Sequence, residues 1–174
     1  MTKRHACSSP GRAARPARLP GLALGLLLGL LLAWSGAARA ADPEILDNQR
    51  LTALVRQQAA AGRVTLVNFW ATWCGPCVME IPELMKLRQE YPEKRLAILG
   101  VSLDFDGREV SRFLARRPVN YPVYLAADDL PQVWAVTSIP KMVVFGPKGE
   151  KIKELEGLTD PKILRSIIDA ALAR

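Results

Sequence analysis

Two cysteines three positions apart, Cys74 and Cys77, are the residues of this chain best suited to do chemistry. They lie in a Trp-Cys-Gly-Pro-Cys segment. The apolar, β-branched run before them, residues 64–70, predicts a buried strand. The run after them, residues 78–91, has apolar residues close to helical spacing and predicts a helix. A Cys-x-x-Cys pair where a strand gives way to a helix favours reversible dithiol–disulfide exchange.

The expected position of the pair assigns a different part of this exchange to each cysteine. Cys74 should lie at the mouth of the helix, where free backbone N–H groups and the helix dipole stabilise a thiolate. Its pKa should therefore lie below the value of ~8.5 for a free cysteine, which makes it the attacking nucleophile. Cys77, one turn further on, should resolve the mixed disulfide and release the product.

A static disulfide and half of a zinc site are the alternatives for the pair. Zinc takes four ligands from Cys, His or carboxylates, and the chain beyond residue 40 contains no other cysteine and no histidine. A static bond that closes so short a loop removes little entropy from the unfolded chain. We therefore expect a redox-active disulfide between Cys74 and Cys77, with no other cofactor and no resident metal.

The first 40 residues have the composition of a targeting segment. An arginine-rich stretch leads into the apolar run 21–33, which is followed by Ala38-Arg39-Ala40. These features predict a signal peptide, residues 1–40, and a folded domain over residues 41–174. A retained membrane anchor is the alternative, because no charge falls between Arg18 and Arg39. Both alternatives place the domain outside the cytoplasm, and the membrane is a partner only if the segment is retained.

The net charge of +7 is concentrated in the same segment. Residues 1–40 contain six basic residues and no acidic one, which leaves 18 basic and 17 acidic residues, a net charge of +1, in the rest of the chain. A domain that binds nucleic acid needs a clustered positive charge. The balance therefore argues against nucleic acid as a partner.

The remainder of the chain alternates strand and helix patterns. Asp42 and Pro43 predict the start of a helix that ends at Gly62. The other expected elements are strands over 96–103, 121–125, 142–145 and 151–156, and helices over 107–117, 130–136 and 161–172. The buried face of the last helix is predicted to hold Ile163, Leu164, Ile167, Ile168, Ala171 and Leu172. This order predicts a three-layer α/β domain.

Four segments together resemble one known family. They are Val-Asn-Phe-Trp-Ala-Thr-Trp-Cys-Gly-Pro-Cys over 67–77, Glu-Ile-Pro over 80–82, Ile139-Pro140, and Phe-Gly-Pro-Lys-Gly over 145–149. The chain resembles the TlpA/ResA-like branch of exported bacterial thioredoxin-like proteins over about residues 45–172. The resemblance implies a thioredoxin fold, in which helices flank a central mixed β-sheet. It also implies an extra helix and strand, which residues 107–125 fit.

The resemblance also implies roles for residues around the cysteines. Thioredoxin uses a buried aspartate as the proton acceptor for its second cysteine, and Asn68 stands in that place here. Glu80 follows Cys77 by three residues, and the branch has a functional glutamate there. We therefore expect a partly buried Glu80 with a raised pKa to relay the proton of Cys77. An exposed helix glutamate is the alternative.

A substrate groove is the second feature that the resemblance implies. Ile139 and Pro140 match the family's cis-proline loop, which faces the cysteines and pairs the backbone of Ile139 with an extended substrate. An ordinary proline that opens an edge strand is the alternative. Trp73 is expected to form one wall of the groove, and Gly75 and Pro76 lie between the cysteines.

The function implied by the resemblance is that of a periplasmic thiol–disulfide oxidoreductase that reduces protein disulfides. Members of the branch reduce haem-attachment cysteines during cytochrome c maturation, or cysteines of copper sites. The partners would be protein disulfides and a membrane thiol that donates electrons. The Gly75-Pro76 dipeptide matches thioredoxin and favours a reducing couple, and a monomer is expected.

Two other functions are compatible with the sequence. One is a periplasmic disulfide oxidant or isomerase, although an isomerase would need a dimer and no dimerisation segment is evident. The other is a non-enzymatic Cu(I) carrier or docking module, in which Met79 joins the two cysteines as a soft ligand. A methionine at such a helix position more often fills hydrophobic space.

Overall fold

A mixed six-stranded sheet with the strand order β1-β4-β3-β2-β5-β6 forms the centre of the protein. The computed structural model describes residues 42–173, so the predicted signal or anchor segment 1–40 lies outside the described residues. In chain order the elements are β1 (Ile45–Leu46), α2 (Asn48–Ala60), β2 (Val64–Trp70), α3 (Gly75–Glu90), β3 (Leu96–Ser102), α4 (Gly107–Arg116), β4 (Val123–Ala126), α5 (Leu130–Val133), β5 (Lys141–Phe145), β6 (Lys151–Glu156) and α6 (Pro161–Leu172). None of the helices in the described part is long and apolar enough to cross a bilayer.

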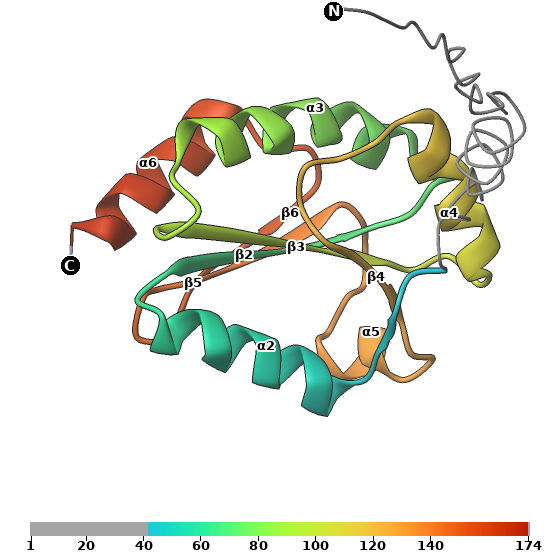
Figure 1. Cartoon of the computed structure of the whole chain (residues 1–174), viewed down its shortest axis with the longest axis horizontal. Coiled ribbons are helices and arrows are strands. Elements are labelled where there is room, and N and C mark those ends of the chain that lie inside the picture. The colour runs from blue at the N-terminus through green and yellow to red at the C-terminus, as the bar shows by residue number, and fades with distance from the viewer. Residues whose placement is uncertain (1–41, 174) are drawn as a thin grey trace, which may run out of the picture. The chain divides into compact units, whose positions relative to one another are not determined.

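Helices cover both faces of this sheet. The α3 and α6 helices lie over one face, and α2 and α5 lie over the other (Figure 1). The α4 helix and the β4 strand are the helix–strand insertion expected from the resemblance, and β4 pairs between β1 and β3. The architecture is therefore the predicted α/β thioredoxin fold with its extra helix and strand.

The β2 strand is buried along its whole length, because it lies between two other strands and both of its faces are covered. It runs parallel to β3, with Val64 opposite Leu96, and antiparallel to β5. The carboxyl ends of β2 and β3 and the start of β5 therefore meet at one edge of the sheet. This geometry brings three loops together: the one with the cysteines, the one that follows β3, and the one with Pro140.

Two of the three apolar clusters in the described residues fill most of the space between the sheet and the helices on its two faces. One joins β2, β3 and β5 to α3 and α6 and includes Leu66, Leu84 and Ile168, all completely buried. The other joins the opposite face of the sheet to α2 and includes Leu51 and Phe69. Burial of a side chain of this size contributes about 1.5–3 kcal/mol relative to exposure, so these contacts hold the three layers together.

The start of the domain differs from the sequence-based prediction. The first helix begins at Asn48 and not at Pro43, because Asp47 is its N-cap and accepts a 2.7 Å hydrogen bond from the backbone N–H of Arg50. The residues before it form β1, which pairs in parallel with β4. Pairing with a distant strand therefore overrides the cap signal of Asp42 and Pro43.

The last helix shows a second difference. Its N-cap is Asp160, directly before the predicted start at residue 161, but the predicted buried face is too wide. Leu164, Ile168 and Ala171 are buried, whereas Ile163 is 51% exposed. Spacings of four and three residues keep the buried three on one side of the helix, and Ile163 lies outside that stripe.

Candidate active site

Cys74 and Cys77 form a disulfide at the N-terminus of α3. Cys74 is the N-cap of the helix, and its Sγ accepts a 3.2 Å hydrogen bond from the backbone N–H of Cys77. Its carbonyl accepts a further bond from Val78. The helix dipole places partial positive charge at the same point. Since Cys74 is 7% exposed and Cys77 is fully buried, the first sulfur is the one nearer to solvent.

The proline loop lies against the first of these sulfurs. The Ile139–Pro140 peptide bond is cis, as the resemblance implied. The carbonyl oxygen of Ile139 lies 3.8 Å from the Sγ of Cys74. In the disulfide this sulfur has no hydrogen to donate, so the contact is a close approach that becomes a possible S–H···O bond only after reduction. The structure thus brings together two segments that lie 65 residues apart.

Lys141 holds this loop in place, and the sequence analysis did not single it out. It directly follows Pro140, and its side chain is almost completely buried. The Nζ atom donates hydrogen bonds to the carbonyls of Trp134 (3.2 Å) and Ala135 (2.8 Å) and lies 3.3 Å from the carboxylate of Glu154. A lysine between the proline and the predicted strand 142–145 was the available signal.

Asp104 holds the cysteine loop in a comparable way and was also missed. It is 4% exposed, and its two carboxylate oxygens accept bonds from the backbone N–H (2.9 Å) and the Oγ1 (2.6 Å) of Thr72. A third bond comes from the hydroxyl of Ser102. Because Thr72 precedes Cys74 by two residues, these bonds fix the approach of the chain to the helix. An aspartate directly after a buried strand was the signal in the sequence.

Glu80 is 1% exposed, which excludes the alternative of an exposed helix glutamate. Its Oε1 accepts a 3.1 Å hydrogen bond from the backbone N–H of Thr159, whereas its Oε2 has no partner among the described residues. Burial raises the pKa of Glu80 from 4.5 to about 7, and the bond from Thr159 opposes part of that rise. A carboxyl with the expected raised pKa is therefore present next to the helix turn that holds Cys77, and its burial is more complete than expected.

Asn68 and Tyr121 are the other polar side chains buried in this region. Asn68 is fully buried in β2, and neither its oxygen nor its nitrogen has a partner among residues 42–173. Burial and the nearby carboxylate of Glu80 both raise the pKa of Tyr121, so its hydroxyl remains protonated. Because an amide takes up no proton at ordinary pH, Glu80 is the ionisable carboxyl in this group.

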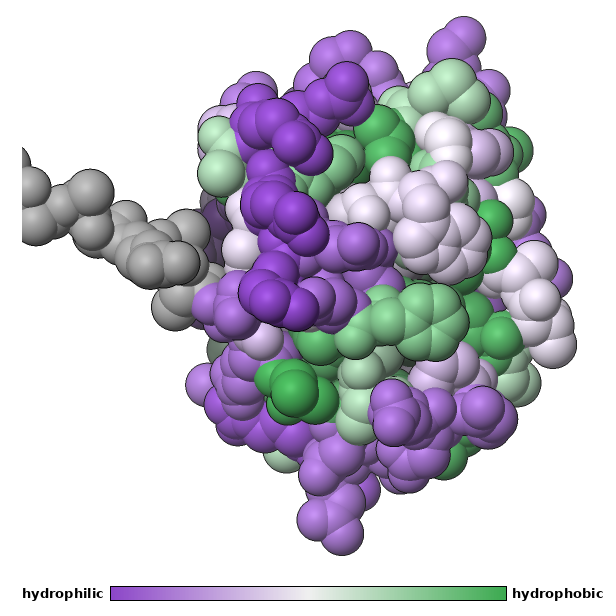
Figure 2. Space-filling view, turned by 90° about the vertical axis from the view of Figure 1, so that its right-hand side faces the viewer, coloured by the Kyte–Doolittle hydropathy of each residue, from purple (hydrophilic) through white to green (hydrophobic). Residues whose placement is uncertain are grey.

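The residues around the cysteines on the outside of the protein are apolar or small. Trp73 is 63% exposed and Met79 is 62% exposed. Gly75 and Pro76 are also exposed. Trp70, by contrast, is buried and packs on Phe113, with 5.2 Å between the ring centres. Figure 2 looks onto the end of the molecule where α4 lies and shows apolar surface bordered by hydrophilic side chains.

Together these features define a class of protein: a thioredoxin fold in which α3 begins at a Cys-x-x-Cys disulfide and a cis-proline loop packs against the first sulfur. The model of the Redoxin family matches residues 40–172. The chain belongs to this family.

Individual relatives agree with this assignment. The thiol-disulfide oxidoreductase ResA of Oceanobacillus iheyensis is 32% identical over 55% of this chain and 50% of its own length. The thiol:disulfide interchange protein HelX of Rhodobacter capsulatus is 32% identical over 64% of this chain and 62% of its own length. The crystal structure of a thioredoxin-related protein from Neisseria meningitidis serogroup B has 29% identity and a TM-score of 0.56, over 64% of this chain and 86% of that one. The chain spans about half the length of the curated relatives it matches.

The raised pKa of Glu80 predicts that the oxidised protein loses stability as the pH rises. Between pH 4.5 and about 7 the unfolded chain has released the proton that the folded protein still holds. The free energy of unfolding should therefore fall across this window, by about 3 kcal/mol in total. Urea unfolding at several pH values should show this fall in the wild type and a weaker dependence in Glu80→Gln. Glu83→Gln should behave like the wild type, and equal slopes in all three proteins would contradict the prediction.

Proposed function

We propose that this protein is an exported, periplasmic thiol–disulfide oxidoreductase that reduces disulfide bonds in other proteins. The observation that carries the proposal is the placement of the two sulfurs. The Sγ of Cys74 lies at the helix N-terminus beside the carbonyl of Ile139, and Cys77 is completely buried behind it. One sulfur can therefore meet a substrate, while the other is protected from competing reactions until the first has reacted.

The reaction follows from this placement. In the reduced protein the thiolate of Cys74 attacks one sulfur of the substrate disulfide, a mixed disulfide forms, and the second substrate sulfur leaves as a thiolate. The thiolate of Cys77 then attacks the Sγ of Cys74, which releases the first substrate sulfur. Two electrons pass to the substrate, and the protein is left with its disulfide. The helix N-terminus stabilises the negative charge on Cys74 in the reduced protein, before this sulfur attacks the substrate.

The substrate backbone has a place beside these sulfurs. The Ile139 carbonyl stands next to Cys74, and the cis-proline loop is held by the buried Lys141 and by a 2.8 Å bond from the N–H of Gly157 to the Pro140 carbonyl. An extended substrate segment would pair with Ile139, and Trp73 would form one wall of the groove. We infer that Gly75 and Pro76, which are exposed between the cysteines, contact the same segment.

The direction of electron flow, the partners and the location complete the proposal. The Gly-Pro dipeptide between the cysteines supports a reducing couple, which requires a membrane thiol donor to restore the dithiol. The substrates would be proteins whose haem-attachment cysteines are reduced during cytochrome c maturation, or proteins with copper-site cysteines. The relatives ResA and HelX, named as thiol-disulfide oxidoreductase and thiol:disulfide interchange protein, support the exchange chemistry.

We propose that Glu80 accepts the proton of the Cys77 thiol and returns it. It lies one helical turn beyond Cys77, its Oε2 is without a partner among the described residues, and its pKa is raised to about 7 by burial. It also lines a hollow of about 260 Å3 between α3 and the turn before α6, together with Met79 and Thr159. That hollow offers a path for the proton to solvent. A carboxyl with a pKa near the working pH is suited to accept and return a proton.

Replacement of one cysteine at a time should separate the two roles. Cys77→Ala should accumulate mixed disulfides between Cys74 and a disulfide-containing test protein, because no thiol remains to resolve them. Cys74→Ala should form none, since Cys77, the cysteine that then remains in residues 41–174, is buried. Non-reducing electrophoresis followed by mass spectrometry measures the adducts. A Cys77→Ala protein without adducts would argue for a copper carrier that does not cycle its thiols.

The reduction potential of the pair tests the direction. We expect a reduction potential near that of thioredoxin, about −270 mV. To measure it, the protein is equilibrated with glutathione buffers of known ratio, its free thiols are alkylated, and the reduced fraction is determined by mass spectrometry. A value near −120 mV, typical of the strong oxidant DsbA, would make the protein a disulfide donor and would contradict the proposed direction while leaving the exchange chemistry intact.

The relay predicts a specific kinetic defect in Glu80→Gln. The step in which Cys77 resolves the mixed disulfide should slow by about a hundredfold at neutral pH, and its dependence on pH near 7 should disappear. Glu83→Gln, on the same helix but paired with Lys86 at 2.7 Å, is the matched control and should keep the wild-type profile. Stopped-flow measurement of the resolving step would refute the relay if both variants matched the wild type.

A further inference from the structure

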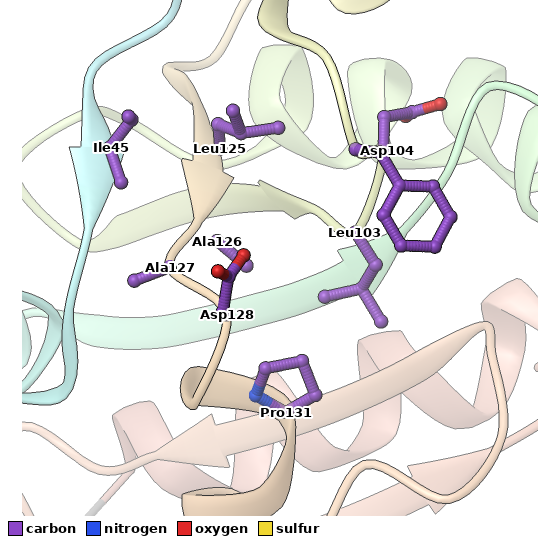
Figure 3. A pocket seen from close by; sticks show the side chains of 9 residues that line it. Ile45, Leu103, Asp104, Leu125, Ala126, Ala127, Asp128 and Pro131 are labelled. Atoms are coloured by element: carbon purple, nitrogen blue, oxygen red, sulfur yellow. The ribbon is translucent and has the colours of Figure 1, made fainter.

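A hollow of about 620 Å3 lies beside the cysteine loop, and the proposed chemistry does not use it. It opens where β3 and β4 end, with Ile45 of β1 on one side, Leu103 and Asp104 on the other, and Asp128 and Pro131 at the start of α5 (Figure 3). We refer to it as the β4 groove. Its volume falls within the range of about 300–1,000 Å3 that is typical of ligand sites.

The β4 groove is connected to the redox centre through Asp104. Asp104 forms part of its wall, but its carboxylate points away from the hollow (Figure 3) and accepts the two hydrogen bonds from Thr72. Thr72 precedes Cys74 by two residues. A segment bound in the groove would therefore lie next to the loop that carries the attacking sulfur.

Unburied apolar side chains gather at the β4 groove. Phe105 lines it and is 99% exposed, which makes it the most exposed large apolar side chain in the described part of the chain. Ile45, on the opposite side, is 63% exposed. An aromatic ring held fully in water next to a cavity is typical of an interaction surface, where such rings supply the anchoring contacts.

The backbone and the charges around the groove indicate what would bind. The β1 strand is at the edge of the sheet and pairs only with β4 among the described strands, so its outer N–H and C=O groups can accept an extended chain. Glu44 and Asp106, which adjoin the lining residues Ile45 and Phe105 in the sequence, are paired with Arg50 and Arg108. Asp128 is exposed and forms no ion pair within residues 42–173.

We propose that the β4 groove docks an extended segment of the client polypeptide, in which a large apolar side chain packs on Phe105 and a lysine or arginine lies beside Asp128. The proposal rests on the proposed function, because the docked segment belongs to the protein whose disulfide Cys74 attacks. The groove selects clients by the residues that flank their cysteines, and the chemistry at Cys74 is the same for all of them.

Two reporter peptides test this selection. Each carries one cysteine as a mixed disulfide with nitrothiobenzoate, flanked on both sides by Phe and Lys in the first peptide and by Phe and Glu in the second. The reduced protein, expressed from the full sequence, should react with the lysine peptide about tenfold faster at low salt. The difference should shrink as salt is added, since charge across an exposed rim is screened.

Substitutions at the β4 groove test whether the preference between the two peptides arises there. Phe105→Ser should slow the reaction with both peptides, and Asp128→Lys should reverse the preference for lysine. Both side chains are exposed, so neither change should disturb the fold. Ile163→Ser on α6 and Glu93→Lys in the turn before β3 are the matched controls, with similar changes at exposed positions away from the groove. They should behave like the wild type.

Bis(2-hydroxyethyl) disulfide, a small uncharged substrate, separates the two proposals. All these proteins should reduce it at the same rate. If the wild-type protein reduces this small disulfide but reacts with the two peptides at equal rates, the docking proposal alone is overturned. No reaction with any disulfide would overturn the proposed function and the docking proposal together. A wild-type dimer that dissociates on Phe105→Ser would show that a second copy of the chain covers the groove, and would also overturn the proposal.

Discussion

The burial of β2 is the constraint on which the rest of the structure depends. All seven of its residues, Val64–Trp70, are buried, and hydrogen bonds to β3 on one side and to β5 on the other leave the strand no freedom to shift. A slip of one residue would turn Leu66 and Asn68 to the opposite face. The strand therefore sets where Cys74 emerges, and its pairing with β5 sets where the proline loop faces that cysteine.

Three buried charged side chains surround this framework, and the number of their partners distinguishes their roles. Lys141 and Asp104 each form several short contacts, so their charges are compensated and they act as anchors for the two loops of the site. Glu80 has one bond from Thr159 and one oxygen without a partner among the described residues. Burial without full compensation raises the carboxyl pKa of Glu80, and this suits its side chain to proton transfer.

The helix–strand insertion changes the surface without changing the redox centre. In this fold β4 lies between β1 and β3, so β1 stands at the edge of the sheet. The end of β4, with Leu125 and Ala126, then forms part of the β4 groove. The dithiol chemistry depends on the N-terminus of α3, whereas the surroundings that could distinguish clients come from the insertion and from the loop with Phe105. The reactivity of the dithiol and the proposed selection of clients thus come from separate parts of the fold, and Asp104 contacts both.

Local patterns in the sequence determined the redox motif, the bounds of β2, the helix that follows it and the α/β class, because strand and helix periodicity and the Cys-x-x-Cys spacing are short-range properties. The cis-proline loop and the site glutamate came from family resemblance, and their burial and contacts came from the fold. Only the tertiary structure decided that Asp104 reaches Thr72 across 32 residues and that Glu80 is bonded to Thr159 across 79. It also exposed Ile163 and made β1 a strand. Such outcomes depend on which residues, distant in the sequence, supply hydrogen-bond partners to a side chain or bury it. The periodicity of a local segment does not encode these long-range contacts.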